Sequence, residues 1–307
     1  MTARVPAVGV IGAGAVGQAV GGALVAAGVC GRLFVVSRAG EQAAALADDL
    51  DDMRAALGSP VRPCPAEVLE LRDCAAVVVA VRAKFTNTRS TDVRMGGAQA
   101  NAPVLRSLAA QFVGYRGTVL VVTNPVDLMT RLFAEESGCP RVFGIGSSLD
   151  TARYRLTLAR LLDVPAAAVS GHVIGEHGEA AVVCASSTRV NGQPVPVPLQ
   201  EVRDELSRRP GRINAGIGRT RCGPAGAVVS ALLLALGAED GTTELSAPYG
   251  GDWCGIPVRF TGGRPLPFLP PLDLVEARQW EASRSKLRAT YPAVRGVPLQ
   301  PLPSGRN

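Results

Sequence analysis

A glycine-rich segment near the N-terminus has the spacing of a phosphate-binding turn. Residues 8–11 (VGVI) precede residues 12–17 (GAGAVG), a G-x-G-x-x-G sequence between an apolar run and an alanine-rich run. Gly12 permits a tight turn, Gly14 lets the backbone approach a pyrophosphate, and Gly17 lets the next helix pack on the strand. We therefore predict a dinucleotide site at Gly12, Gly14, Ala15, Val16 and Gly17. The alternative is a tight turn in a chain rich in alanine and glycine.

The residues after the second apolar run discriminate between cofactors. A site for NAD places Asp or Glu there, because a carboxylate accepts a hydrogen bond from the ribose 2′-hydroxyl. This chain has Ser37 and Arg38 instead. A carboxylate would repel a 2′-phosphate, whereas a hydroxyl and a guanidinium would bind it, so the pair favours NADP, with NAD as the alternative. If both residues are merely exposed in a loop, the cofactor choice is made elsewhere.

The chain contains two histidines, and one of them has the surroundings of a proton donor. Histidine has the side-chain pKa nearest to neutrality, which suits it to proton transfer. His177 lies in a loop between glycines and acids, whereas His172 lies in a strand-like run and is interpreted as structural. Asp150 and Arg153 are three residues apart in a helical run and therefore share one face. Without a histidine beside them, they would be an exposed ion pair.

Short apolar runs alternate with helical runs in the first half of the chain. The predicted strands lack an alternation of buried and exposed positions, which indicates a parallel sheet covered on both faces. We therefore predict an α/β fold with a Rossmann-type doubly wound parallel sheet over residues 1–146. The expected strands are 8–11, 33–36, 75–81 and 118–122, and the expected helices are 15–27 and 41–53.

The pattern changes after residue 146, where hairpin-like and helical runs mix. We expect helices at 149–162, 201–209, 224–236 and 274–290, and strands at 172–174, 181–185 and 187–197. Asn191-Gly192 gives the last of these runs a hairpin turn. This mixture predicts a second, α+β domain over residues 147–307 that carries the substrate and catalytic residues and packs closely against the first.

Composition excludes several classes of protein. The 307 residues carry a net charge of +6, but only Lys84 and Lys286 are lysines, which indicates codon bias rather than a nucleic-acid surface. The apolar runs are far shorter than the ~18 residues of a membrane span. Seven widely spaced cysteines without a C-x-x-C pair suit free thiols and no metal site. We therefore expect a cytoplasmic protein with no nucleic-acid, membrane or metal partner.

Segments in both halves resemble the lactate/malate dehydrogenase family in the family's own order. The resemblance covers nearly the whole chain and implies an NAD(P)-dependent L-2-hydroxy acid dehydrogenase that is a homodimer or homotetramer. Such an enzyme transfers a hydride between NADP(H) and a 2-oxo or 2-hydroxy acid. The segments are 9–17 (GVIGAGAVG), 122–127 (VTNPVD), 146–153 (GSSLDTAR), 174–179 (IGEHGE), 255–258 (GIPV) and the helix through Lys286.

The resemblance implies a role for each candidate side chain. His177 would deliver the proton, and Asp150 would orient the imidazole and raise its pKa by favouring imidazolium. Arg153 would grip the substrate carboxylate with two hydrogen bonds. Asn124 would bind the substrate, and the backbone near Val122 would line the nicotinamide side. The bond from Asn124 to the following proline is a candidate for a cis peptide.

The segment after the third predicted strand resembles the family's mobile loop only in part. Arg94 and Asn101 have the family's seven-residue spacing between the carbonyl-polarising arginine and an asparagine on the cofactor side. Gly96-Gly97 replaces an acidic-leucine pair, no P-G step is present, and the loop is longer. We predict that Arg94 polarises the carbonyl when the loop closes.

Arg89 is our candidate for binding a second anionic group on the substrate. In malate-type relatives, an arginine of this loop binds the second carboxylate of the substrate. Here Thr88 stands at the corresponding distance before Arg94, and Arg89 is the next residue. The alternative is that the loop cations are solvated or touch the cofactor phosphates. Pro224 stands near the expected substrate position, and Pro210 interrupts a helix that is usually long.

These departures leave several functions open. The favoured substrate is malate or oxaloacetate, or a specialised 2-oxo acid with a second anionic group. The first alternative is a lactate-type or branched 2-oxo acid reductase that uses NAD(H). The second is a sensor that binds the dinucleotide without catalysis, although a sensor would not need the set formed by Asp150, Arg153 and His177.

Overall fold

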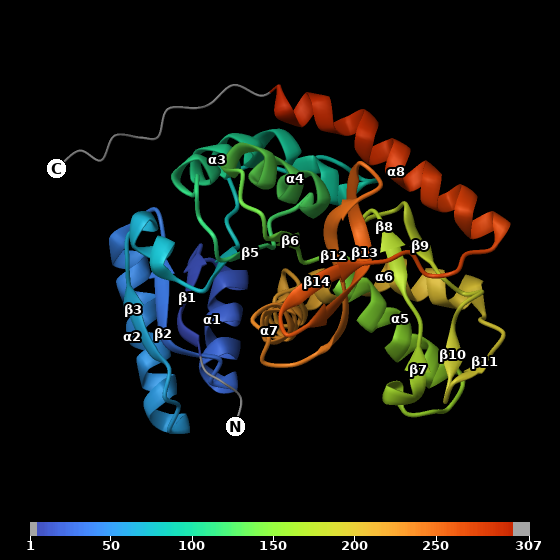
Figure 1. Cartoon of the computed structure of the whole chain (residues 1–307), viewed down its shortest axis with the longest axis horizontal. Coiled ribbons are helices and arrows are strands. Elements are labelled where there is room, and N and C mark those ends of the chain that lie inside the picture. Colours follow the sequence, from blue (N-terminus) through green and yellow to red (C-terminus); the bar gives the residue numbers. More distant parts are fainter. Residues whose placement is uncertain (1–4, 297–307) are drawn as a thin grey trace.

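Four strands predicted from the sequence, together with two that it did not predict, 62–65 and 142–144, form the parallel part of a continuous sheet. The computed structural model describes residues 5–296, so the outer ends of the two predicted domains, 1–4 and 297–307, lie outside the described residues (Figure 1). The parallel strands are β1 (Val5–Ile11), β2 (Cys30–Val36), β3 (Arg62–Pro65), β4 (Ala76–Val79), β5 (Thr118–Val121) and β6 (Val142–Gly144). Their order, β3-β2-β1-β4-β5-β6, is that of a Rossmann-type sheet.

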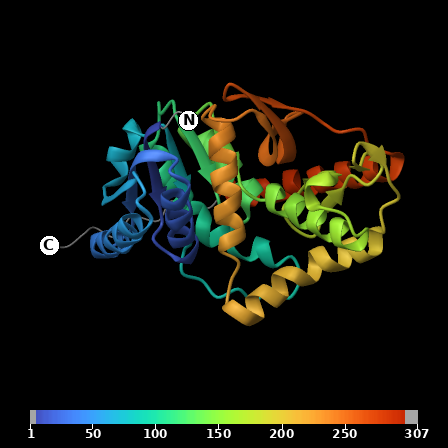
Figure 2. The same ribbon diagram turned by 90° about the horizontal axis from the view of Figure 1, so that it is seen from below.

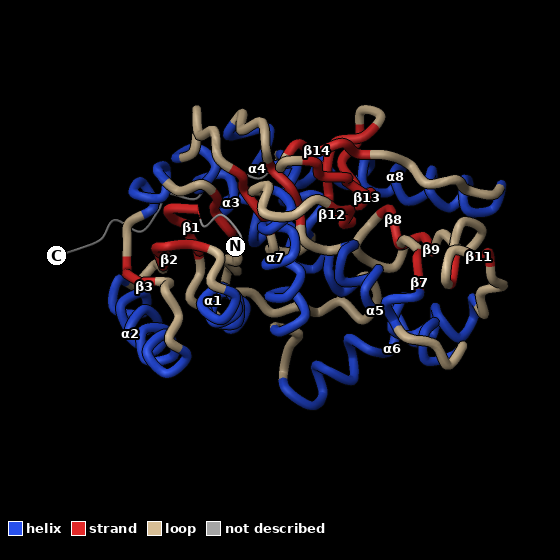
Figure 3. The backbone as a smooth tube through the Cα atoms, turned by 60° about the horizontal axis from the view of Figure 1, so that its bottom comes forward, coloured by secondary structure: helices blue, strands red, loops and turns tan. Residues whose placement is uncertain are grey.

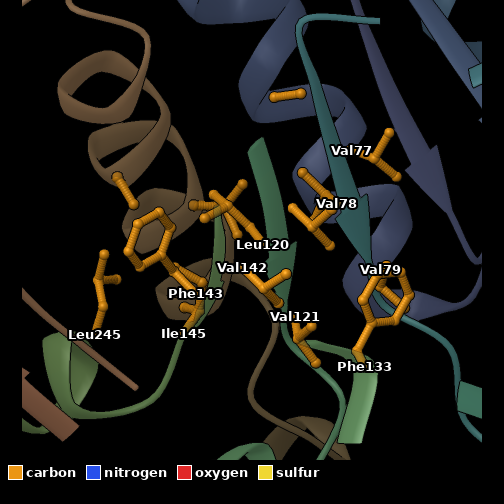
Figure 4. Close-up of a cluster of buried hydrophobic side chains, with 14 of the residues drawn as sticks. Val77, Val78, Val79, Leu120, Val121, Phe133, Val142, Phe143, Ile145 and Leu245 are labelled. Carbon is orange, nitrogen blue, oxygen red and sulfur yellow. The ribbon is translucent and has the colours of Figure 1, made fainter. Parts of the chain in front are cut away.

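Helices cover both faces of this parallel half, as the doubly wound prediction requires. Figure 1 shows α3 (Ala98–Gln111) and α4 (Val126–Ser137) on one side of the strands, with α1 (Ala15–Ala27) and α2 (Gly40–Leu57) on the other. Every residue of β4, β5 and β6 is buried, and their valine, leucine and phenylalanine side chains form the core (Figure 4). The continuous apolar runs in the sequence arise from this burial on both faces.

Antiparallel strands extend the same sheet through the second half of the chain. Across the described residues the sheet has 11 strands, and β12 joins it to β6 by pairing Ser246 with Gly144. The added strands are β8 (Val173–Gly175), β9 (Ala181–Val183), β12 (Gly241–Tyr249), β13 (Asp252–Thr261) and β14 (Arg264–Pro267). The sequence did not predict the long β12–β13 hairpin.

A small separate sheet confirms the predicted hairpin turn. It consists of β7 (Val169–Ser170), β10 (Arg189–Val190) and β11 (Gln193–Pro194). Asn191 and Gly192 connect the last two strands with φ angles of 50° and 79°. Two positive φ angles in a two-residue connection match the twist of a hairpin and favour Asn-Gly.

Four longer helices complete the second half. They are α5 (Ser147–Leu161), α6 (Leu199–Ile217), α7 (Cys222–Ala235) and α8 (Leu274–Arg295). Figure 2 shows α7 standing between the N-terminal helices and the remainder of the second half, and it packs against α1. Arg141 also joins the halves, because its guanidinium donates to the Thr118 hydroxyl and to the carbonyls of Ala235 and Gly263. None of the described helices is long and apolar enough to cross a membrane.

The prediction that Pro210 interrupts its helix is wrong. Helix α6, which lies at the margin of the molecule in Figure 3, continues through this residue to Ile217. Proline removes one backbone hydrogen bond. Two arginines flank the proline, and both pair with Glu205. The Glu205 carboxylate lies 3.5 Å from the guanidinium of Arg209, before the proline, and 2.7 Å from that of Arg212, after it. Pro224 lies in the first turn of α7, where helical N–H groups have no intrahelical acceptor.

Two glycine-to-alanine changes in helices should have opposite effects on stability. A Cβ on Gly17 would lie 1.6 Å from the Gly12 carbonyl oxygen, whereas one on the exposed Gly226 meets nothing within 4 Å. We expect Gly17→Ala to lower the free energy of unfolding by more than ~1 kcal/mol. Gly226→Ala should raise it by ~0.5–1 kcal/mol. Urea unfolding measures both, and equal effects would contradict the close packing at Gly17.

Candidate active site

The glycine turn between β1 and α1 has the geometry to hold a pyrophosphate. Gly12 has a φ of 115°, and its N–H donates to the Val36 carbonyl at 2.8 Å. A Cβ there would lie 2.6 Å from the Ala80 carbonyl oxygen, so only glycine fits. Gly14 is exposed and caps α1 without any side chain, and the first turn of α1 contains no acidic residue. The N–H groups of Ala15, Val16 and Gly17 are thus available to an anion.

Ser37 and Arg38 lie where β2 ends, beside this turn. The Ser37 hydroxyl donates to Oε1 of Gln42 at 2.6 Å, and the Gln42 amide donates to the Ala13 carbonyl in the glycine turn at 3.4 Å. Arg38 is exposed. Helix α2 begins just beyond without a capping side chain, and Glu41 is the acidic residue of its first turn. The surroundings therefore offer a hydroxyl, a guanidinium and helix N–H groups to a phosphate.

The structure brings His177 next to Asp150 and Arg153, although His177 lies 27 residues after Asp150 in the sequence. Nδ1 of His177 lies 2.6 Å from Oδ2 of Asp150, and the Arg153 guanidinium lies 3.6 Å from Oδ1 of the same carboxylate. All three side chains are buried. Gly146 makes the close approach possible, because a Cβ there would lie 2.7 Å from Cβ of His177. Nδ1 is engaged by Asp150, which leaves Nε2 as the atom that can exchange a proton.

The surroundings of this pair lower the pKa of both members, through burial for His177 and through neighbouring positive charges for Asp150. Burial lowers the pKa of His177, the positive charge of Arg94 lowers it further, and the opposing effect of Asp150 does not overcome them. Burial alone would raise the pKa of Asp150, but His177 and the two arginines outweigh it. Asp150 therefore acts on the pKa of His177 in the expected direction, but burial and Arg94 outweigh it, so the net pKa is lowered. The resting pair is a neutral imidazole beside an ionised carboxylate.

The loop after β4 carries Arg94 to this pair. Arg94 lies in the short 3-10 helix η2 (Val93–Gly97) and is half-buried, and its charge acts on Asp150, Arg153 and His177. Arg89 lies earlier in the same loop with an exposed side chain, and the described contacts do not bring it to these residues. Its contact with substrate stays a prediction.

The two glycines that replace the family's acidic-leucine pair have a packing reason. A Cβ on Gly96 would lie 2.1 Å from Oδ1 of Asn87, and one on Gly97 would lie 2.8 Å from the Phe85 ring. The loop therefore folds back onto η2, and a larger residue at either glycine would have to displace the Asn87 or Phe85 side chain. Within the loop, the Arg82 guanidinium stacks 4.4 Å from the centre of the Phe85 ring, which accounts for one of the loop cations.

The 122–127 segment contains a cis peptide bond and two candidate site residues, Val122 and Asn124. The bond between Asn124 and Pro125 is cis, as anticipated, and the Asn124 side chain is exposed. Asn101 is buried, and its amide accepts from Ala83 N–H and donates to the Asn124 carbonyl. Asn101 thus ties the start of the loop to this segment, and its cofactor contact stays a prediction. The N–H of Val122 donates to the Val79 carbonyl at the end of β4.

Two residues of this site were not identified from the sequence. The buried carboxylate of Asp127 accepts from the His177 backbone N–H at 2.8 Å, and burial raises its pKa to about 7. Asp127 is the last residue of the 122–127 segment, and the resemblance of that segment to the family was a signal that could have identified it. Arg209 on α6 adds its positive charge to burial and Arg94 in lowering the pKa of Arg153. Helix α6 packs along α5, which local sequence does not reveal.

Metal chemistry has no obvious ligand set in the part of the chain that the structure describes. Over residues 5–296, no group of three or more histidine, cysteine or acidic side chains is placed to hold an ion. The seven cysteines are free thiols.

Proton titration of His177 by NMR tests the balance of charges. Because the chain has two histidines, the resonances can be assigned with one variant. We expect His177 to titrate below the usual value of about 6.5. Arg94→Gln should raise its pKa by removing a positive charge, and Arg288→Gln, on the distant face of α8, should leave it unchanged. An unaltered curve in Arg94→Gln would contradict the placement of that charge.

Two sequence profiles and two curated relatives indicate the family of this chain. A sequence profile described as "lactate/malate dehydrogenase, NAD binding domain" matches residues 7–146, and one described as "lactate/malate dehydrogenase, alpha/beta C-terminal domain" matches residues 147–209. The L-lactate dehydrogenase of Staphylococcus saprophyticus is 32% identical over 189 residues, which is 60% of this chain and 58% of that protein. That of Bacillus velezensis is 31% identical over 216 residues, which is 68% of this chain and 67% of that protein.

Solved structures share the fold over almost the whole chain. The minor L-lactate dehydrogenase of Enterococcus mundtii superposes with a TM-score of 0.88 and 26% identity, covering 96% of this chain and 100% of that one. The malate dehydrogenase of Cryptosporidium parvum gives a TM-score of 0.86 at 22% identity, covering 95% and 99%. Together with the profile matches, which run without a gap from residue 7 to residue 209, these findings show that the chain belongs to the lactate/malate dehydrogenase family.

Proposed function

We propose that the protein is an oxidoreductase that transfers a hydride between NADP(H) and a 2-oxo or 2-hydroxy acid. The observation that carries the proposal is the buried contact of 2.6 Å between His177 and Asp150, with Arg153 beside it. A site that only bound a dinucleotide would need the glycine turn. It would not need a buried proton donor, His177, next to an arginine that can bind a substrate carboxylate, Arg153. The family to which the chain belongs supports the same reaction class.

The proton moves at Nε2 of His177. Asp150 occupies Nδ1, fixes the plane of the ring and stabilises imidazolium when it forms. A nicotinamide dinucleotide bound along the glycine turn would supply or accept the hydride. In the direction of reduction, the carbonyl carbon gains the hydride and its oxygen gains the proton from Nε2. In the direction of oxidation, the neutral imidazole takes the proton back, so charge and atoms balance.

The arginines couple substrate binding to protonation of His177. Arg153 can bind the substrate carboxylate with two parallel hydrogen bonds, and Arg94 can polarise the carbonyl next to it. Before substrate binds, the Arg94 charge opposes imidazolium. An incoming carboxylate offsets that positive charge, so the pKa of His177 rises and the proton is taken up with the 2-oxo acid. The exposed amide of Asn124 is a further candidate for a hydrogen bond to the substrate.

A second anionic group on the substrate is favoured by the charge of the site. Arg94 and Arg209 both act on Arg153 as like charges, and Asp150 is already shared with His177. Arg209 already faces Glu205 at 3.5 Å, so a single carboxylate at Arg153 would leave the half-buried Arg94 facing only the shared Asp150. We therefore favour a substrate like oxaloacetate or malate, or another 2-oxo acid with a second anion, held by Arg89 or Arg209.

The favoured cofactor is NADP(H), because Ser37 and Arg38 replace the carboxylate that would repel a 2′-phosphate. A lactate-type reaction with NAD(H) is the second candidate, since the relatives named above are L-lactate dehydrogenases. Assembly as a homodimer or homotetramer is proposed from the family alone.

Cofactor consumption with a panel of 2-oxo acids tests the proposal. We expect NADPH to be oxidised fastest with an acid that carries two anionic groups, such as oxaloacetate, and pyruvate to react at least ~10-fold more slowly. Arg38→Gln should lower kcat/KM for NADPH by about tenfold and spare NADH, because the ion pair with the 2′-phosphate is lost. Turnover with NADH alone would overturn the 2′-phosphate argument, and turnover of pyruvate alone would favour the lactate-type reaction.

Matched variants locate the second anion. Arg209→Gln and Arg89→Gln each remove one candidate guanidinium, and the one that binds the second group should raise KM for oxaloacetate far more than for pyruvate. The exposed Arg208, next to the first of these, provides the control, because Arg208→Gln should change neither KM. If neither candidate variant separates the two substrates, the dianion proposal fails.

A further inference from the structure

Lys286 lies where three segments of the protein meet. It is on α8, and its Nζ donates to Oδ1 of Asp92 and to Oε2 of Glu176, both at 2.8 Å. Asp92 belongs to the loop after β4, two residues before Arg94, and Glu176 immediately precedes His177. One ammonium group therefore connects the segment of the carbonyl-polarising candidate to the segment of the proton donor.

The Glu176 side of this contact is fixed inside the protein. The side chain of Glu176 is 1% exposed, and its Oε2 also accepts from the Ala180 N–H at 3.0 Å. Its own backbone N–H donates to the Ser283 hydroxyl, which lies one helical turn before Lys286 on the same face of α8. Helix α8 thus holds the His177 loop through both the main chain and the side chain of Glu176.

The Asp92 side belongs to an exposed loop and depends on few contacts. Asp92 has a φ of 51°, in the left-handed region, and its N–H donates to Oε1 of Glu179 at 2.5 Å. Its carboxylate reaches Lys286, and its carbonyl accepts from the Met95 N–H in η2. The neighbouring residues 86–91 are exposed. Asp92 is therefore where the loop is fastened to the rest of the site.

We propose that Lys286 is a positioning residue that latches the Arg94 loop to the His177 loop through Asp92 and Glu176. This inference rests on the proposed function for its kinetic consequence, but not for its structural one. With the latch in place, Arg94 stands at a fixed place relative to Nε2 of His177. Without it, the loop is released from α8, and Arg94 spends less time at the substrate carbonyl.

The electrostatics of the contact agree with this role. Burial works against the charged ammonium, but the hydrogen bonds that it donates to the two carboxylates outweigh it and raise the pKa of Lys286. The lysine thus stays charged over the whole working range of pH. Glu176 is almost fully buried and has Lys286 as its counter-charge, so a neutral residue at 286 would leave a buried carboxylate unbalanced. Asp92 can be altered without that penalty.

Asp92→Asn is consequently the sharpest test. Asparagine tolerates the left-handed conformation and is nearly isosteric, so only the charge of the latch is removed. We expect trypsin to cleave the native variant after Arg89 and Arg94 about tenfold faster than the wild type, with an unchanged melting temperature. High salt should speed cleavage of the wild type more than that of the variant. In turnover with a 2-oxo acid, kcat should fall while the Kd for NADPH does not change.

Variants at position 286 complete the test. Lys286→Met should release the loop at least as much and should also lower the melting temperature, because the buried Glu176 loses its counter-charge. Lys286→Arg should restore protection from trypsin and most of kcat. Arg288→Met removes a cation from the same helix that pairs with Glu281, and it should change neither readout. Cleavage of Asp92→Asn at the wild-type rate would overturn the latch. Absence of turnover in the wild type would contradict the proposed function, while the proteolysis result would still decide the latch.

Discussion

A hydrogen bond of 2.6 Å joins Nδ1 of His177 to Asp150 where both side chains are almost removed from water, and much of the neighbouring structure serves that contact. Glycine at position 146 leaves room for the imidazole, and the Asp127 carboxylate holds its backbone N–H. A buried imidazole that lost this partner would keep neither its tautomer nor its orientation. The pair therefore fixes which ring nitrogen can face a substrate.

The surrounding arginines set the conditions under which this pair works. Burial and the positive charge of Arg94 disfavour a positive charge on His177, while Arg94 and Arg153 help to hold Asp150 ionised. The site gains a proton most readily when an anion arrives, so binding and protonation become linked through the same charges. Because Arg94 stands on a loop and Arg153 on a helix, the linkage depends on how that loop is held against the His177 segment.

Much of the fold could be predicted from local sequence, and the site in part. Strands buried on both faces are apolar throughout, so β1, β4 and β5 were recognisable, and α1 was predicted at both ends because a glycine turn precedes it and Gly28 follows. The β12–β13 hairpin was missed, since its polar residues hide a strand that is buried by distant elements. The approach of Arg209 to Arg153 and the net pKa direction of His177 depend on helix packing and on competing charges, which no local pattern contains.

Replacement of His177 by asparagine tests the central claim most directly. Asn keeps a polar group of similar shape but cannot carry a proton between pH 5 and 8. NADPH binding, followed by its fluorescence, should be unchanged, whereas turnover of the preferred 2-oxo acid should fall by about 10²–10⁴-fold. His172→Asn, at the other histidine, which contacts Glu244, is the matched control and should retain turnover. Full turnover in the His177 variant would contradict the account, because the proton would then have another source.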